Sequence, residues 1–140
     1  MLLAITLGVA CFTVCGAIHF LALNKAAQIT GNLNSSNSLQ MLVAVHIAAA
    51  AHVLEAGVYG LAYMMGLRFG IGEFQSDTAL SAMDVLHFSL ITYTSLGLGD
   101  VVPTNHLRFI SGLEALNGFL LISCSASFIF IQMSRSRKKS

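Results

Sequence analysis

The chain has 140 residues, of which 56% are hydrophobic and only 9% are charged, and its mean hydropathy is +0.78. Soluble domains carry about 25% charged residues, so this composition is typical of an integral membrane protein. The formal charge of +1 excludes the broad basic surface that nucleic-acid binding requires. The sequence holds no set of nucleophile, base and orienting residue and no phosphate-binding loop, so we expect neither an enzyme nor a protein with a soluble substrate.

Three stretches are long and apolar enough to cross a bilayer, which needs about 20 apolar residues in a helix. We expect membrane-spanning helices at residues 1–24, 41–67 and 107–133. The first two are separated by a run of turn formers that includes Asn34 and Ser35, which predicts a polar loop over residues 25–40. Residues 134–140 form a short basic tail that ends the chain.

Orientation follows from the cations, because cytoplasmic flanks of spanning helices are enriched in Lys and Arg. Four of them lie in the tail: Arg135, Arg137, Lys138 and Lys139. We therefore expect a cytoplasmic C-terminus and, with three spans, an N-terminus outside the cell membrane. Lipids that contact the basic tail are expected partners.

Between the second and third spans lies an apolar stretch that is too short to cross the membrane. Ser81 and Asp84 have the spacing of a capping box, which predicts a helix over residues 82–94. The alternate glycines Gly97 and Gly99 then make continued helix unfavourable. A short helix followed by Gly-rich backbone predicts a re-entrant loop, which is stable at membrane depth only if it is buried in protein or lines a water-filled path.

The segment Thr94-Ser95-Leu96-Gly97-Leu98-Gly99-Asp100, with Pro103 after it, resembles the potassium-channel signature Thr-Thr-Val-Gly-Tyr-Gly-Asp. The surrounding residues 41–133 resemble the pore domain of small bacterial ion channels. The resemblance implies an all-helical homotetramer with an outer helix at 41–67, a pore helix at 82–94, a filter at 95–100 and an inner helix at 107–133. Residues 1–24 are then an additional helix.

A dehydrated potassium ion needs several oxygens at once, which rings of backbone carbonyls supply. Carbonyls that point the same way require alternating left- and right-handed backbone, and glycine adopts the left-handed form without penalty. The resemblance therefore implies potassium sites, with no transition-metal site and no other cofactor, at the filter residues Ser95, Leu96, Gly97, Leu98 and Gly99. The side chains of Leu96 and Leu98 are expected to pack outward against the pore helix.

The sequence departs from the family pattern at Leu98, which replaces Tyr, and at Ser95, which replaces Thr. His87 and Phe88 stand where many family members have a Trp pair that braces the filter. We hypothesise that His87 hydrogen-bonds Asp100 and that Glu114 packs behind the filter near Thr92 or Tyr93. Filter support is thus expected from Thr94, His87, Asp100 and Glu114.

The predicted inner helix carries Gly118 close to where related channels have a hinge glycine. Gly118 is expected to serve either as a hinge or as a site of close packing. At helical spacing, three residues share one face that lines the cavity or else packs against lipid or helices: Phe119, Ile122 and Ala126.

Other readings stay open at this point. The chain could be a non-selective monovalent cation channel, a non-conducting membrane subunit, or a membrane metal or redox protein that uses His19, His46, His52 and Glu55. His46 and His52 are about 120° apart around a helix, which weakens the metal site. His52 and Glu55 are three residues apart, so a local His–Glu pair is the simpler expectation.

Overall fold

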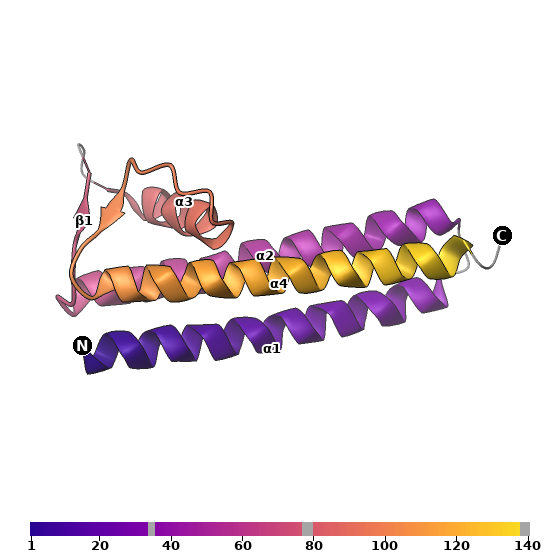
Figure 1. Ribbon diagram of the computed structural model, residues 1–140, viewed down its shortest axis with the longest axis horizontal. Helices are drawn as coiled ribbons and strands as arrows, with labels where there is room; N and C mark the ends of the chain where they lie inside the picture. Colours follow the sequence, from indigo (N-terminus) through magenta and orange to yellow (C-terminus); the bar gives the residue numbers. More distant parts are fainter. Residues whose placement is uncertain (34–35, 77–79, 138–140) are drawn as a thin grey trace.

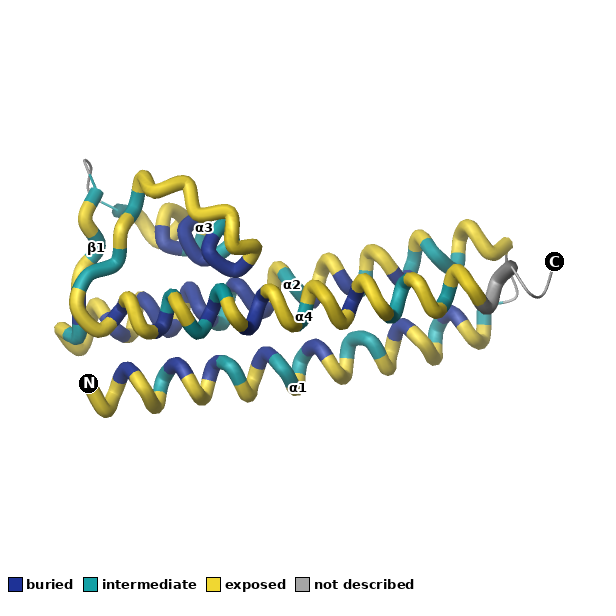
Figure 2. The backbone as a smooth tube through the Cα atoms, in the orientation of Figure 1, coloured by how far each residue is buried: buried dark blue, intermediate teal, exposed yellow. Residues whose placement is uncertain are grey.

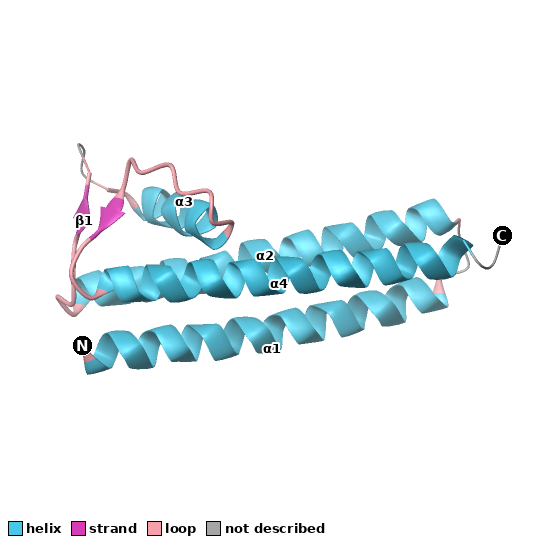
Figure 3. Ribbon diagram, viewed as in Figure 1, coloured by secondary structure: helices cyan, strands magenta, loops and turns pink. Residues whose placement is uncertain are grey.

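The computed structural model describes residues 1–33, 36–76 and 80–137. Asn34 and Ser35 of the predicted loop and Lys138 and Lys139 of the predicted tail lie outside the described residues. The described chain contains four helices, which are α1 (Leu2–Asn32), α2 (Asn37–Arg68), α3 (Ala82–Tyr93) and α4 (Leu107–Arg137). A two-stranded antiparallel ribbon pairs β1 (Phe74–Gln75) with β2 (Val102–Pro103) (Figure 3).

Within the described residues, three helices are long and apolar enough to cross a membrane: α1, α2 and the Leu107–Ser134 part of α4. They lie side by side along the long axis of the molecule, and α3 lies near the end that carries the ribbon and the N-terminus (Figure 1). The C-terminus is at the opposite end. Both α1 and α3 pack against α2 and α4, and within the described residues they do not contact each other.

Small residues on one face of α1 allow it to approach the rest of the bundle closely. Ala4, Gly8, Cys11 and Cys15 are all buried. A Cβ added to Gly8 would lie 2.7 Å from Leu113 Cδ1 of α4, so a larger residue at this position would require the Leu113 side chain to shift. The additional helix is therefore part of the helix bundle, while its outward-facing residues stay exposed (Figure 2).

The loop between the first two long helices is shorter than expected. α1 continues to Asn32, well into the predicted 25–40 loop, because Lys25, Ala26 and Ala27 are good helix formers. α2 starts at Asn37 with Ser36 as its N-cap, and the Ser36 hydroxyl accepts the Leu39 amide at 3.4 Å. Likewise α4 runs on to Arg137, so the predicted tail begins as helix.

The short helix α3 begins with the predicted capping box. The Asp84 carboxylate accepts the Ser81 amide at 2.7 Å, and the Ser81 hydroxyl accepts the Asp84 amide at 3.3 Å. An aromatic cluster holds α3 and the ribbon on α2, because the Phe88 ring packs edge-on against Tyr63 and Phe74 at centroid distances of 5.2 and 4.9 Å.

Candidate functional site

The backbone after α3 alternates between left-handed and ordinary conformations. Ser95, Gly97 and Gly99 have φ values of 59°, 52° and 79°, whereas Leu96 and Leu98 between them have no positive φ. The two glycines adopt the conformations that the sequence predicts. Ser95 adds a third left-handed position, at a steric cost that glycine does not have, and the sequence carried no signal for it.

Hydrogen bonds tie the start of this loop to the last turn of α3. The Ser95 amide donates to Thr92 O at 2.8 Å, and the amides of Leu96 and Gly97 donate to Ile91 O at 2.9 and 3.3 Å. In the part of the chain that the structure describes, no backbone carbonyl of residues 95–99 accepts a hydrogen bond. The first three amides of the loop are thus used internally, while its carbonyl oxygens stay available to a ligand.

The leucines of the loop are not covered within one chain. Leu96 is 67% exposed and Leu98 is 59% exposed, so neither packs against α3 as the sequence analysis expects. The reason is geometric, because the apolar face of α3 is already turned toward α2 and α4. A large exposed apolar surface beside unpaired carbonyls is the kind of surface that a second protein chain covers.

Two of the expected supporting residues make only local contacts. The Thr94 hydroxyl donates to Ile91 O at 3.1 Å, and Asp100 Oδ1 accepts the amide of Val101 at 3.1 Å. His87 is exposed, and no hydrogen bond joins it to Asp100 among the described residues. The proposed His87 brace is therefore absent within a single chain.

Glu114 lies behind α3, but one turn earlier than expected. It is fully buried, and its carboxyl oxygens meet the hydroxyls of Ser89 and Tyr63, both at 2.5 Å, rather than Thr92 or Tyr93. The Ser89 hydroxyl also lies 2.6 Å from Ala56 O, and its single hydrogen serves only one acceptor. All three contacts are satisfied if Glu114 is a neutral acid that donates to Ser89, because Ser89 then donates to Ala56 O and Tyr63 donates to the other oxygen of Glu114. A neutral acid is also less costly than a carboxylate in apolar surroundings.

A second buried polar cluster joins all four helices. His19 Nδ1 lies 3.0 Å from one Glu55 carboxylate oxygen, His52 Nδ1 lies 3.2 Å from the other, and the Tyr93 hydroxyl donates to that second oxygen. Ser125 Oγ lies 3.2 and 3.1 Å from the Nε2 atoms of His19 and His52. The predicted His52–Glu55 pair is confirmed.

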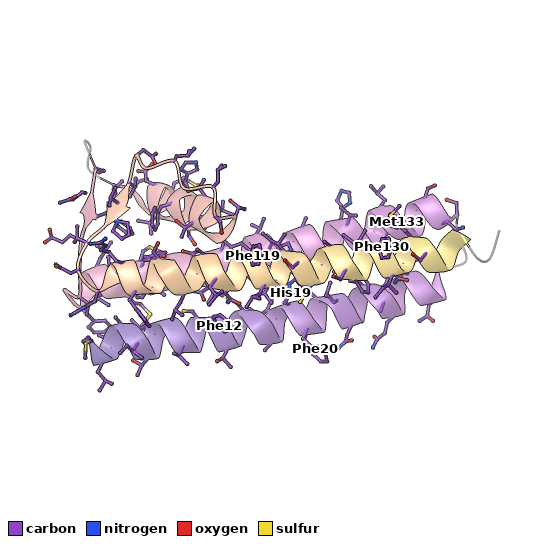
Figure 4. All side chains as sticks on the ribbon, viewed as in Figure 1. Phe12, His19, Phe20, Phe119, Phe130 and Met133 are labelled. Carbon is purple, nitrogen blue, oxygen red and sulfur yellow. The ribbon has the colours of Figure 1, made fainter. Side chains whose placement is uncertain are left out.

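His46 is not part of this cluster. It is exposed, and its Nδ1 lies 2.8 Å from Leu42 O of its own helix. His19, by contrast, is buried and points toward α4, whereas the neighbouring Phe20 points away from the bundle (Figure 4). Sequence reasoning missed the roles of Tyr93 and Ser125, because helices far apart in the chain carry no common spacing signal.

α4 carries both a buried contact with α3 and an exposed apolar surface. Gly118 packs on the end of α3, where an added Cβ would overlap the carbonyl oxygen of Tyr93. This contact favours the close-packing alternative for Gly118. The predicted cavity-lining residues Phe119, Ile122 and Ala126 are exposed on α4, so no other helix of the described chain covers them.

The fold defines a multi-pass helical membrane protein with a Gly-rich, carbonyl-presenting loop between its last two long helices. Residues 41–135 match the ion channel family, and the chain belongs to it. The match covers α2 to α4 and begins after α1. Comparisons with curated proteins and with solved structures give no match. The family membership identifies a passive ion channel.

Proposed function

We propose that the protein is a potassium-selective channel that assembles as a homotetramer and conducts through the loop at residues 95–99. The observation that carries the proposal is the left-handed backbone at Ser95, Gly97 and Gly99 beside carbonyls that accept no internal hydrogen bond. Successive carbonyls that face one way replace the water around a potassium ion.

The depth of α3 supports a re-entrant pore helix. Its last residue, Tyr93, packs on Gly118, which is about 17 Å along α4 from Leu107 at about 1.5 Å per residue. The C-terminal end of α3 therefore lies well inside the apolar layer, where its partial negative charge favours a cation. Non-helical backbone at this depth is stable where it is buried in protein or lines a water-filled path, and a pore supplies both.

A homotetramer supplies the ring of carbonyls that one chain cannot form. A single loop contacts an ion from one side only, so a ring of carbonyls needs several subunits around an axis. The same assembly covers the exposed side chains of Leu96 and Leu98. Below the filter, Phe119, Ile122 and Ala126 would line a cavity, and an apolar constriction there gates by losing water.

We place the protein in the cell membrane with its N-terminus outside and its C-terminus in the cytoplasm. This orientation puts the filter loop, which lies at the N-terminal end of the bundle, near the outer surface (Figure 1). Hydrated potassium then enters from outside, exchanges water for carbonyl oxygens and moves by repulsion between neighbouring ions.

The test is the reversal potential of the purified protein in planar bilayers with potassium on one side and sodium on the other. We expect a reversal potential that strongly favours potassium. A reversal near zero with measurable current would indicate a non-selective cation pore, and no current in either ion would indicate a non-conducting subunit.

A filter variant shows whether the current passes through this loop. Gly99→Ala places a side chain at a φ of 79°, which costs about 1–2 kcal/mol for an L residue. We expect it to reduce both conductance and selectivity. Gly112→Ala is the matched control, because nothing lies within 4 Å of an added Cβ at that helical position.

A further inference from the structure

The Glu55 cluster has the composition and geometry of a metal site. One ligand atom each from His19, His52 and Glu55 lies within 4.8 Å of the others. Two imidazoles and one carboxylate are a common protein donor set for zinc and other first-row divalent metals. We propose that these three side chains bind a divalent transition-metal ion, such as Zn²⁺, between α1 and α2.

The distances between the donors fit such an ion. The Nδ1 atoms of His19 and His52 lie 3.0 and 3.2 Å from the carboxylate oxygens of Glu55. Bonds of about 2.0–2.2 Å to one metal ion place neighbouring ligand atoms roughly 3.0–3.5 Å apart. The two nitrogens lie at these separations from different oxygens of Glu55, so one ion is coordinated if Glu55 binds through both oxygens or if the side chains move closer together.

Ser125 supplies the outer support that metal-binding histidines require. Its Oγ lies 3.2 and 3.1 Å from the Nε2 atoms of His19 and His52. A hydroxyl oxygen has two lone pairs, so it accepts an N–H from both rings and leaves both Nδ1 atoms free for the metal. Without the ion, the same rings can carry their protons on Nδ1 and donate to Glu55, so metal binding exchanges one tautomer for the other.

Tyr93 offers the nearest further oxygen. Its hydroxyl lies 3.1 Å from His52 Nδ1 and hydrogen-bonds Glu55. As a fourth ligand that loses its proton to solvent, Tyr93 would join Glu55 in balancing the two positive charges of the ion. The His52 side chain is 20% exposed, whereas His19 and Glu55 are 3% and 0% exposed, so the ion would enter from the His52 side.

The ion would connect the additional helix to the conducting part of the protein. His19 comes from α1, His52 and Glu55 come from α2, Tyr93 ends α3, and Ser125 lies on α4. Metal binding at this place does not depend on conduction through the loop. It therefore adds to the proposed channel function without resting on it.

The experiment uses the full-length protein, purified with a chelator, loaded with Zn²⁺ and freed of excess metal. Elemental analysis should find one zinc ion per subunit, and zinc should raise the midpoint of thermal unfolding. His19→Gln should abolish both effects, and Ser125→Ala should weaken zinc binding about 10–100-fold. His46→Gln is the matched control, because His46 lies outside the cluster.

Three results would overturn the proposal. The first is that the native protein holds no zinc above background. The second is that His19→Gln keeps its zinc, and the third is that His46→Gln loses as much zinc as His19→Gln. If His19→Gln does not fold, Co²⁺ loading of the native protein decides, because bound Co²⁺ gives visible absorption bands and their absence contradicts a site. A protein that binds zinc and carries no current would contradict only the channel proposal.

Discussion

The hydroxyl of Tyr93, the last residue of α3, donates a hydrogen bond to Glu55 in the middle of α2. Tyr93 comes two residues before Ser95, where the left-handed backbone begins. Glu55 is itself held by His19 and His52. The start of the candidate filter is therefore fixed by a buried polar cluster and not by the loop alone.

Removing this hydroxyl should affect both stability and selectivity. In Tyr93→Phe, Glu55 loses one donor in a fully buried position, which costs about 1–3 kcal/mol. The end of α3 is then less firmly placed, so the potassium preference in bi-ionic reversal potentials should fall. Unfolding by denaturing detergent, together with these recordings, measures both effects.

Tyr59→Phe is the control for this change. Tyr59 is equally buried, but its hydroxyl accepts from Asn117 of α4 rather than bonding α3. It should lower stability and leave the reversal potential unchanged. Equal changes of selectivity in the two variants would show that Tyr93 has no special role in placing the filter.

Replacement by glutamine should affect the free energy of unfolding little at Glu114 and strongly at Glu55. If Glu114 is a neutral acid, one oxygen donates to Ser89 and the other accepts from Tyr63, and a Gln side chain reproduces both contacts. Glu114→Gln should therefore change the free energy of unfolding by less than about 1 kcal/mol.

Glu55 differs because every side-chain neighbour can donate to its carboxylate. His19, His52 and Tyr93 all face its oxygens, so an amide NH₂ at this place would meet a donor. Glu55→Gln should cost about 1–3 kcal/mol or more. The free energy of unfolding should be measured in the presence of a chelator, so that bound metal does not contribute to the difference between the variants. Equal losses of stability in Glu55→Gln and Glu114→Gln would contradict these hydrogen-bond assignments.

Gly118 and Gly112 on α4 provide a second contrast. Gly118→Ala would push a methyl group into the carbonyl of Tyr93, an overpacking that costs about 1–3 kcal/mol. Gly112→Ala meets no atom within 4 Å, and alanine favours a helix by about 1 kcal/mol over glycine. The first variant should lose stability and current, and the second should gain stability. A conducting Gly118→Ala channel of normal stability would argue against this contact.

Features that depend on neighbouring residues could be predicted from the sequence. The capping box of Ser81 and Asp84, the His52–Glu55 pair and the conformations of Gly97 and Gly99 are all set by local spacing and local sterics. The three long apolar helices follow from composition in the same way.

The partners of the buried polar groups could not be predicted, because they depend on how helices pack. His19 and Glu55 are 36 residues apart, and Ser125 is 106 residues from His19. The sequence analysis places Glu114 near Thr92 or Tyr93, but the Tyr93 hydroxyl bonds Glu55, and Glu114 contacts Ser89 and Tyr63 instead. An isolated charge in a span signals that a partner exists without showing which helix supplies it.

The capping box at the start of α3 should make stability depend on pH in acid. Hydrogen bonds from the Ser81 amide and hydroxyl lower the pKa of the Asp84 carboxyl below its ordinary value. Because the folded state favours the ionised form, this contribution is fully present above the unfolded pKa of about 3.9 and is lost as the pH falls through the lower, folded value.

Asp84→Asn tests this link between the cap and acid stability. The variant should be less stable than the native protein at neutral pH, because an amide caps the Ser81 donors less well than a carboxylate. Its stability should also fall less steeply below about pH 4, where only the native protein has the Asp84 carboxylate to protonate. Thermal unfolding of both proteins across acid pH measures the difference. Parallel pH curves would mean that the Asp84 carboxylate contributes nothing to holding the start of α3, and that the aromatic packing of Phe88 fixes this helix instead.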